Sequence, residues 1–409
     1  MGLLLDPKLN AKIDTLARQG LTKTEISRRL GVHRNTVLKY WPKGVPHPDV
    51  RRTPTEAANP IEAQRKKSEA DKQRKEHIAA VKELAFREWL GAIIRDNTQP
   101  MPAAPPPKLD RAGRKSHHRF PLLVLNDWHF EERVASAGVM GLNAYDIETA
   151  CRRLYRIVRA AIGWKRDQER GGRCVLPQLT VAMIGDFLTG TLHGLERHSD
   201  APNIVRAALA CGDLIAMVLR DLAAEWPQVQ VLGVVGNHGR LPDDRKVPTK
   251  DPTRSWDYLA YEVARRRLAN QTNITWELPE AYGVLFEVGG HLCYACHGNF
   301  IPNNLGVVGY GVRRFTTSLS SNLQAAGKPM RYAFFGHFHS SQASEFAGIE
   351  AFICPSLIGT QEYSFLSGGS VNRSAQELHV FDKDLGHVTR ERLYGDGPGY
   401  DGAYELKGL

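Results

Sequence analysis

Residues 121–129 read PLLVLNDWH, an apolar run typical of a buried strand that leads directly into Asp127 and His129. Four further runs, three apolar and one mixed (LCYAC), end in the same way, at Gly185-Asp186, Gly236-Asn237-His238, His297-Gly298 and Gly336-His337-Phe338-His339. Strand ends in an α/β sheet converge on one crevice. We therefore expect these side chains to gather. Two carboxylates, four imidazoles and one amide form a ligand set for two divalent metals rather than one.

Two of the segments repeat a metal-seeking residue at a spacing of two. In an extended chain, residues i and i+2 point the same way while the middle residue packs on the other side. Asp127 with His129, and His337 with His339, are therefore expected to reach one site. Carboxylates combined with imidazoles suit Mn²⁺, Fe or Zn²⁺, with Mg²⁺ as a further candidate, whereas Ca²⁺ prefers mostly oxygen ligands. The expected cofactor is a pair of divalent ions, with Mn²⁺ preferred.

The series D-x-H, G-D, G-N-H, H and G-H-x-H resembles the metallophosphoesterase (calcineurin-like) superfamily over roughly residues 120–360. The resemblance implies an α/β fold, a four-layer αββα sandwich of two mixed sheets, and hydrolysis of phosphoesters by two metals. The implied ligands are Asp127, His129, Asp186 and His339 for one metal, and Asp186, Asn237, His297 and His337 for the other. Asp186 would bridge the two metals. His238 would orient the phosphate or protonate the leaving oxygen.

Two segments depart from the pattern of the protein Ser/Thr phosphatases in this superfamily, which is G-D-x-x-D-R-G and GNHE. The corresponding segments here are GDFLTGT at 185–191 and GNHGR at 236–240. Gly239 stands where many relatives have an acid that steadies the histidine, so either another group orients His238 or His238 is not the general acid. Arg240 is a second catalytic candidate, because a guanidinium can bind a nonbridging phosphate oxygen, although a surface salt bridge explains it equally well.

Two further segments have both a functional and a structural interpretation. The double-strand-break repair nucleases of the superfamily carry an additional active-site histidine after the G-D segment, where this chain has His193 and His198. An ordinary loop histidine is the simpler interpretation for both. Residues 355–363, PSLIGTQEY, follow another strand-like run and either shape the substrate pocket or form a packed turn.

The net charge of +10 is unevenly distributed. Residues 1–120 contain 25 basic and 13 acidic side chains, a net charge of +12, whereas residues 121–409 contain 29 and 31, a net charge of −2. Such an asymmetry predicts an appendage that binds a polyanion on a nearly neutral body.

Residues 21–41, LTKTEISRRLGVHRNTVLKYW, predict two short helices joined by a turn at Gly31. Thr22 and Glu25 have the spacing of a capping box, and Val37 and Leu38 are expected to face inward. The stretch resembles the helix-turn-helix of resolvases and transposases, whose second helix enters the DNA major groove. The residues expected to face DNA are His33, Arg34, Asn35, Thr36 and Lys39. Three-helix cores of this kind can also be protein-binding modules.

Residues 61–96 are rich in Ala, Glu, Lys, Arg and Gln, which predicts a long polar helix. Its apolar residues gather late, at Ile78, Val81, Leu84, Ala85, Trp89 and Ile93. They indicate either a solvated helix with one apolar end or a docking surface. Such a surface would contact the catalytic domain or a second copy of the chain in a homo-oligomer. With proline-rich segments on both sides, the expected domains are a helix-turn-helix at 1–45, a helical and proline-rich basic linker at 46–118, and a metallophosphoesterase domain at 119–409.

The six cysteines and the hydropathy pattern indicate a cytoplasmic protein without membrane contact. The cysteines are scattered, several of them in strand-like runs, which suits buried thiols in a reducing compartment. Cys293 and Cys296 form a CxxC, but no second CxxC completes a zinc site, so we expect a structural role. No apolar run approaches the ~20 residues that span a bilayer, and the N-terminus does not resemble a signal peptide.

These patterns favour a two-metal phosphodiesterase that acts on DNA, of phage or bacterial origin and closest in kind to the DNA-repair nuclease branch, which often works with an accessory ATPase. Two alternatives stay open. One is a phosphatase or phosphodiesterase on nucleotides or other small phosphoesters, with the N-terminal region used for assembly. The other is a DNA-binding regulator with a vestigial metal site, against which the complete ligand set counts.

Overall fold

The computed structural model describes residues 7–46, 60–107, 117–170, 174–190, 199–201, 203–241, 251–302, 308–368 and 370–406. His193 and His198 lie outside these described residues. The chain divides into two compact units, Met1–Leu90 and Gly91–Leu409. Within the described ranges, no helix combines the length and the apolar character that crossing a bilayer requires.

The first unit begins with three short helices, α1 (Pro7–Arg18), α2 (Lys23–Leu30) and α3 (Arg34–Lys39). They enclose a small core whose fully packed members are Ile13, Ala17, Ile26 and Val37. The predicted capping box is present: the Thr22 hydroxyl accepts from the Glu25 N–H, and the Glu25 carboxylate accepts from the Thr22 N–H at 2.8 Å. Gly31 ends α2 with a left-handed φ of 64°.

The expectation that Leu38 packs inward is wrong. Val37 is fully buried, whereas the side chain of Leu38 is 53% exposed. Successive helical positions are separated by ~100°, so a six-residue helix turns only a narrow face to the core, and Val37 occupies it.

The long polar helix expected at 61–96 is α4 (Pro60–Asn97). The side chains of Ile78, Val81 and Leu84 on this helix are 45–61% exposed. The following proline-rich segment, expected as linker, belongs to the second unit. The Met101 N–H donates to the Arg267 carbonyl at 2.7 Å, and the Gln271 amide bonds both to the N–H and to the carbonyl of Ala104.

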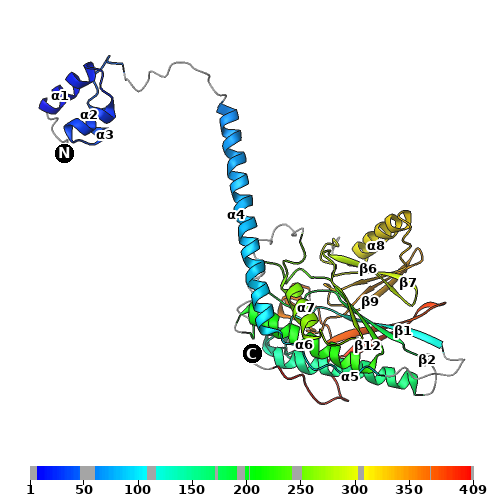
Figure 1. Cartoon of the computed structure of the whole chain (residues 1–409). Coiled ribbons are helices and arrows are strands. Elements are labelled where there is room, and N and C mark those ends of the chain that lie inside the picture. Colours follow the sequence, from blue (N-terminus) through cyan, green and yellow to red (C-terminus); the bar gives the residue numbers. More distant parts are fainter. Residues whose placement is uncertain are drawn as a thin grey trace. The chain divides into compact units, whose positions relative to one another are not determined.

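Two mixed sheets form the centre of the Gly91–Leu409 unit (Figure 1). The first has the order β12-β11-β1-β3-β4-β5 with β2 beside β1, and the second has the order β6-β7-β8-β10-β9. Strands of the first sheet are β1 (His117–Leu125), β2 (Cys174–Val175), β3 (Gln178–Met183), β4 (Gln228–Gly233), β5 (Ile274–Glu277), β11 (Ala375–Asp382) and β12 (Gly386–Tyr394). Strands of the second sheet are β6 (Gly283–Val288), β7 (His291–Cys296), β8 (Tyr332–Phe335), β9 (Gln342–Phe346) and β10 (Ile349–Ile353).

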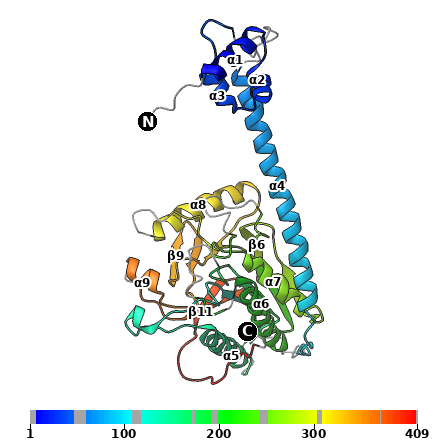
Figure 2. The same cartoon turned by 90° about the vertical axis from the view of Figure 1, so that its left-hand side faces the viewer.

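Apolar side chains of both sheets meet in one interlayer core, which includes Leu122 and Val124 from β1 and Phe334 and Phe352 from the second sheet. The outer layers are helical: α5 (Ile147–Glu169), α6 (Ile204–Glu225) and α7 (Trp256–Arg267) lie on the side of the first sheet, and α8 (Val308–Ala325) covers β9 and β10 (Figures 1 and 2). Two short helices, η2 (Ser136–Val139) and α9 (Glu362–Gly368), contact each other. The architecture is therefore mixed α/β with two mixed sheets, as expected.

The late strands are largely antiparallel, with one parallel stretch in the second sheet. β8 runs parallel to both β7 and β10, because α8 provides a crossover between β7 and β8. β11 and β12 return to the first sheet, where β11 pairs antiparallel with β1. This return places Phe381 of β11 in the interlayer core, and the His379 ring packs against Phe334 and Phe352 of the second sheet.

Candidate metal centre

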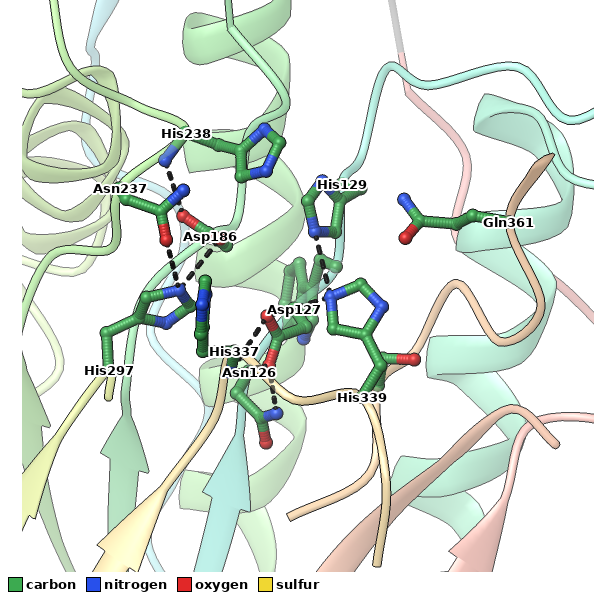
Figure 3. Close-up of polar contacts among 12 residues, drawn as sticks. Asn126, Asp127, His129, Asp186, Asn237, His238, His297, His337, His339 and Gln361 are labelled. Carbon is green, nitrogen blue, oxygen red and sulfur yellow. Dashed lines mark hydrogen bonds and ion pairs between the residues drawn. The ribbon is translucent and has the colours of Figure 1, made fainter. Parts of the chain in front are cut away.

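The predicted ligands lie together at the carboxyl ends of five strands (Figure 3). β1, β3 and β4 of the first sheet end before Asp127, Asp186 and Asn237, and β7 and β8 of the second sheet end before His297 and His337. Both sheets therefore contribute to one site. The convergence of strand ends is what the sequence pattern predicted.

Three side chains, Asp127, His129 and His339, present their ligand atoms to one point, and we call them the His129 group. His339 Nε2 lies 3.1 Å from Asp127 Oδ1 and 3.3 Å from His129 Nε2. Ligands of one ion with bonds of about 2.0–2.2 Å are separated by distances of this size. The group therefore fits one divalent metal.

Four side chains on the other side, Asp186, Asn237, His297 and His337, form what we call the His297 group. His297 Nε2 lies 2.8 Å from Asp186 Oδ2 and 3.1 Å from Asn237 Oδ1, and His337 has a ligand atom within 4.8 Å of those of Asp186 and His297. Asp186 also lies within the same distance of His129. Asp186 is thus placed between the two groups, where a bridging ligand must be.

Hydrogen bonds fix the tautomers of two imidazoles. The Thr189 hydroxyl donates to Glu132 at 2.9 Å, so its oxygen accepts from His129 Nδ1–H at 3.0 Å. His297 Nδ1–H donates to the Ile184 carbonyl at 3.0 Å. His297 Nε2 then faces Asp186 Oδ2 at 2.8 Å, and His129 Nε2 faces His339 Nε2 at 3.3 Å. Each of these contacts needs either a shared proton or a metal ion between the two atoms, and this set of imidazole and carboxylate donors fits a divalent metal.

Five of the seven ligands have a left-handed backbone: Asp127, His129, Asp186, His337 and His339 have φ between 47° and 66°. The alternation of an extended strand is therefore the wrong reason for the D-x-H and H-x-H spacing. Both triplets lie beyond their strands, and paired left-handed residues turn the two side chains to one side. Each such residue costs on the order of 1–3 kcal/mol, a strain typical of functional sites.

Glycines allow the strand-end loops to approach each other closely. A Cβ at Gly236 would lie 2.1 Å from Asp186 Oδ1, and a Cβ at Gly336 would lie 2.7 Å from Asp127 Oδ2. Contacts this short do not occur, so any side chain at either position would displace a carboxylate ligand. This explains why glycine precedes the ligand in the G-N and G-H segments.

Asp257, near the start of α7, organises the same loops, and the motif analysis missed it. Its carboxylate is fully buried and accepts the backbone N–H groups of Asp186, Phe187, Leu188 and Gly236 at 2.9–3.2 Å. Burial, followed by the charge of Asp186, raises the pKa of Asp257 to about 7. Its only signal in the sequence is an acid two residues after an N-capping serine, which is common at helix starts.

The structure shows what holds His238 in place of the acid that Gly239 lacks. His238 N–H donates to Asp186 Oδ1 at 2.8 Å, and its Nδ1 lies 3.3 Å from the Thr189 carbonyl. A Cβ at Gly239 would lie 2.6 Å from Ser255 Oγ, so no side chain fits there. A backbone carbonyl therefore orients the imidazole.

The other candidates are placed less directly. Arg240 Nε donates to the carbonyl of the ligand Asn237 at 2.9 Å, so part of its guanidinium supports the loop. In the first unit, the His33 ring caps α3 by accepting from the Asn35 N–H at 3.3 Å. Of the residues expected to face DNA, Thr36 is half-buried, and the exposed ones are His33, Arg34, Asn35 and Lys39.

Residues 355–363 form a packed turn with one side chain at the edge of the centre. Ser356, Leu357 and Ile358 are fully buried, and the Leu357 N–H donates to the Asp127 carbonyl at 3.1 Å. The Gln361 amide donates to both oxygens of Glu132 at 3.0 Å, on the side of His129 (Figure 3).

The electrostatics of the centre favour charged carboxylates. Burial opposes ionisation of Asp127, but His339 outweighs it and lowers the pKa of Asp127 to about 2. Burial likewise opposes protonation of His297, yet Asp186 raises the pKa of His297 to about 9. Without a metal, protons on the imidazoles therefore compensate the carboxylates. A divalent ion would take over that role and release those protons.

No protein-family profile matches the chain, and no curated protein matches it. Several solved structures are similar to it at low identity. A conserved Streptococcus pneumoniae protein described as a predicted phosphoesterase is 12% identical, with 70% of this chain and 97% of that chain covered and a TM-score of 0.31. An archaeal phosphodiesterase is 10% identical (67% and 99% covered, TM-score 0.32), and zinc-bound Vps29 from Entamoeba histolytica is 12% identical (68% and 99% covered, TM-score 0.26).

Proposed function

We propose that the chain is a two-metal phosphoesterase that hydrolyses phosphodiester bonds, with DNA as the preferred substrate. The observation that carries the proposal is the pair of ligand groups around Asp186, with the His238 ring beside them. When bound, two divalent ions would supply Lewis-acid activation of the phosphoryl group and of the attacking water. Asp127 and His339 would hold one ion, and Asn237 and His297 would hold the other.

We infer that His238 transfers a proton to the leaving group. Its Nδ1 lies 3.3 Å from the Thr189 carbonyl, and its ring lies edge-on to His129 with the centroids 4.8 Å apart. A protonated imidazole at that position can donate to the leaving oxygen, a contribution of about 10²–10⁴-fold in rate. The role needs no acid at position 239.

The burial of these side chains supports one direction of approach for a substrate. Asp127, Asp186 and His297 are completely buried, whereas His238 and His339 are half-buried. The phosphoryl group would therefore meet the centre on the side of His238 and His339. The buried carboxylates would stay shielded from solvent, which strengthens their attraction for the ions.

Charge in the N-terminal region supports DNA as the substrate. Residues 1–120 have a net charge of +12, and Arg34 and Lys39 are exposed on the short helix α3. Contacts from such side chains to phosphates supply affinity that does not depend on sequence and that falls as salt rises.

A substrate panel with Mn²⁺ tests the activity. Linear and nicked duplex DNA, single-stranded DNA, RNA, cyclic nucleotides and bis-p-nitrophenyl phosphate are compared for the full chain and for His337→Ala. Cleavage of DNA by the wild type, lost in the variant, supports the proposal. Absence of any hydrolysis with the metals bound would contradict it and favour a DNA-binding regulator with a vestigial site.

The DNA preference has its own test. Changing Arg34 and Lys39 to Gln should weaken DNA binding and flatten its dependence on salt, by a slope of roughly 0.9 for each lost phosphate contact. Changing Arg74 and Lys75 on α4 to Gln removes the same charge from exposed helical positions and is the matched control. Equal slopes for both variants would leave α3 without a specific role in DNA binding.

The second candidate is hydrolysis of nucleotides or other small phosphoesters, with the N-terminal region used for assembly. The exposed apolar side chains of Ile78, Val81 and Leu84 on α4 favour assembly. This candidate predicts turnover of small phosphoesters without DNA cleavage, and an oligomer that dissociates when Val81 and Leu84 are changed to Lys. Sedimentation of the wild type as a monomer would remove the assembly role.

A further inference from the structure

A second cluster of metal-seeking side chains lies in the interlayer core, outside the two ligand groups. Cys354 follows β10, and Glu377 and His379 are alternate residues of β11. All three residues are fully buried, and their ligand atoms lie within 4.8 Å of one another. None of them belongs to the catalytic centre described above.

Two polar atoms of this cluster face each other without satisfied hydrogen bonds. Glu377 Oε2 and His379 Nε2 lie 3.4 Å apart, and neither makes a hydrogen bond within the described part of the chain. The other carboxylate oxygen, Oε1, is fully used, because Arg390 and the Ser341 hydroxyl both donate to it at 2.7 Å. An unsatisfied buried polar atom costs on the order of 1–3 kcal/mol.

The far side of His379 indicates which nitrogen carries its proton. His379 Nδ1 lies 3.1 Å from His387 Nε2, and His387 Nδ1 lies 3.3 Å from Glu350 Oε2. If both rings carry their proton on Nδ1, His379 donates to His387 Nε2, and His387 donates to the Glu350 carboxylate. The His379 Nε2 lone pair then faces Glu377 and Cys354. Metal-binding histidines typically donate their second N–H to such a partner.

We propose that Cys354, Glu377 and His379 form a third metal site, separate from the two-metal centre, which takes Zn²⁺. A thiolate, an imidazole and a carboxylate are ligands that Zn²⁺ accepts together, and one further oxygen would complete four-coordination. The ion would satisfy both Glu377 Oε2 and His379 Nε2. Binding would displace the thiol proton to solvent, leaving two anionic ligands for a divalent cation.

The simpler alternative is a buried ion pair in which His379 is protonated and Glu377 is charged. Two observations count against it. Burial lowers the pKa of His379, despite the opposing effect of Glu377. The charge of Glu377 is also already compensated by Arg390, which donates to Oε1.

The position of the cluster suggests what the ion would do. The Cys354 carbonyl accepts from the Asn126 amide at 3.5 Å, and the same amide donates to the Asp127 carboxylate. Gln376, beside Glu377, accepts from the Asn126 N–H at 2.8 Å. A metal at Cys354 would therefore stiffen the support beneath the His129 group without contacting substrate.

Cobalt substitution tests the site in the full chain. Both catalytic ligand groups lack sulfur, so a near-ultraviolet thiolate-to-cobalt charge-transfer band can come only from a cysteine ligand. The proposal predicts this band in the wild type, its loss in Cys354→Ser, and its retention in Cys293→Ser. Cys293 is the matched control, because it is a fully buried thiol of the same interlayer core. Metal analysis should give three ions per wild-type chain and two in Cys354→Ser.

The wild-type spectrum decides the question even if Cys354→Ser fails to fold. Cobalt bound at the catalytic centre without a charge-transfer band would overturn the proposal. A band that persists in folded Cys354→Ser would also overturn it, since another thiol would then be the ligand. His379→Gln gives a second readout, with the thiol intact and the expected ion lost.

Discussion

The two ligand groups are built alike but are held differently. In the His129 group, the imidazole is oriented by side chains, since His129 Nδ1–H donates to Thr189 and Thr189 donates to Glu132. In the His297 group, the imidazole is oriented by the backbone, since His297 Nδ1–H donates to the Ile184 carbonyl. The side-chain support of His129 can be altered by a single substitution, whereas the support of His297 is a backbone carbonyl that no substitution removes.

This difference indicates which of the two groups can have its metal affinity changed by substitutions around it. Burial raises the pKa of Glu132 to about 7, against the opposing hydrogen bond from Thr189. The charge behind His129 can therefore change near neutral pH, whereas the carbonyl behind His297 cannot. We expect the ion of the His129 group to be the more sensitive of the two to second-layer substitutions.

Replacing Asp186, the ligand that the two groups share, should damage both groups at once. Asp186→Asn removes the negative charge between the groups, so we expect a loss of turnover of 10²–10³-fold or more. Bound metal should fall from two catalytic ions to one or none. The measurement is the rate on the best substrate together with metal analysis. Full activity with two ions still bound would contradict the assignment of Asp186 as a bridge.

The loop anchor should affect both groups through stability. Asp257→Asn replaces one acceptor oxygen by a donor and leaves two of the four N–H groups unsatisfied, at about 1–3 kcal/mol each. At roughly 2–4 °C per kcal/mol for a large domain, the melting temperature should fall by about 4–24 °C.

The control for Asp257→Asn is Asp213→Asn. Asp213 forms a partly exposed ion pair with Arg267, away from the strand-end loops. A half-exposed ion pair contributes about 0–1 kcal/mol, so this variant should melt close to the wild type. Equal melting temperatures for Asp257→Asn and Asp213→Asn would show that the four N–H contacts do not stabilise the loops.

Much of this centre could be predicted from sequence, because its ligands follow strands. Four of the five ligand segments follow an apolar run, and runs such as 121–125 are easily recognised as buried strands. The reason given for the D-x-H spacing was nevertheless wrong, since the left-handed φ of Asp127 and His129 is set by loop contacts that spacing does not encode.

The supporting residues could not be predicted, because their roles depend on distant partners. Asp257 lies 71 residues from Asp186, and Gln361 lies 229 residues from Glu132. Asp257 stands in no motif, and an acid near a helix start is ordinary. Gln361 lies in the segment 355–363 that was singled out, but nothing in that segment indicates which side chain reaches the centre. The return of β11 to the first sheet was likewise not predicted, since strand order depends on tertiary packing.

Thr189→Val should separate the two groups. The substitution keeps the shape of the side chain but removes the hydroxyl between His129 and Glu132. One catalytic ion should bind about 10–100-fold more weakly, while the other is unchanged. Stepwise metal titration against a chelator measures both affinities. Thr316→Val is the matched control, because the Thr316 hydroxyl is buried without a hydrogen bond in the described part of the chain. Equal weakening of both ions would show that the groups are not supported independently.

The smallest effect, a shift in melting temperature with pH, should have opposite signs in the two groups of the metal-free protein. Burial, against the opposing charge of Asp186, lowers the pKa of His129 well below 6.5, whereas Asp186 overcomes burial and raises the pKa of His297 to about 9. The His297 contribution is fully present below pH 6.5 and is lost as pH rises through about 9. The His129 penalty grows as pH falls below 6.5, because only the unfolded chain then takes up the proton.

Chelator-treated protein should therefore lose a few degrees in melting temperature on either side of pH 6.5, on the scale of roughly 2–4 °C per kcal/mol. His297→Gln should flatten the profile between pH 6.5 and 9, and His129→Gln should flatten it below pH 6.5. Each variant is the control for the other, because each leaves the opposite limb intact. If both variants flattened the same limb, the two histidines would share one electrostatic environment, and the contrast between the groups would fail.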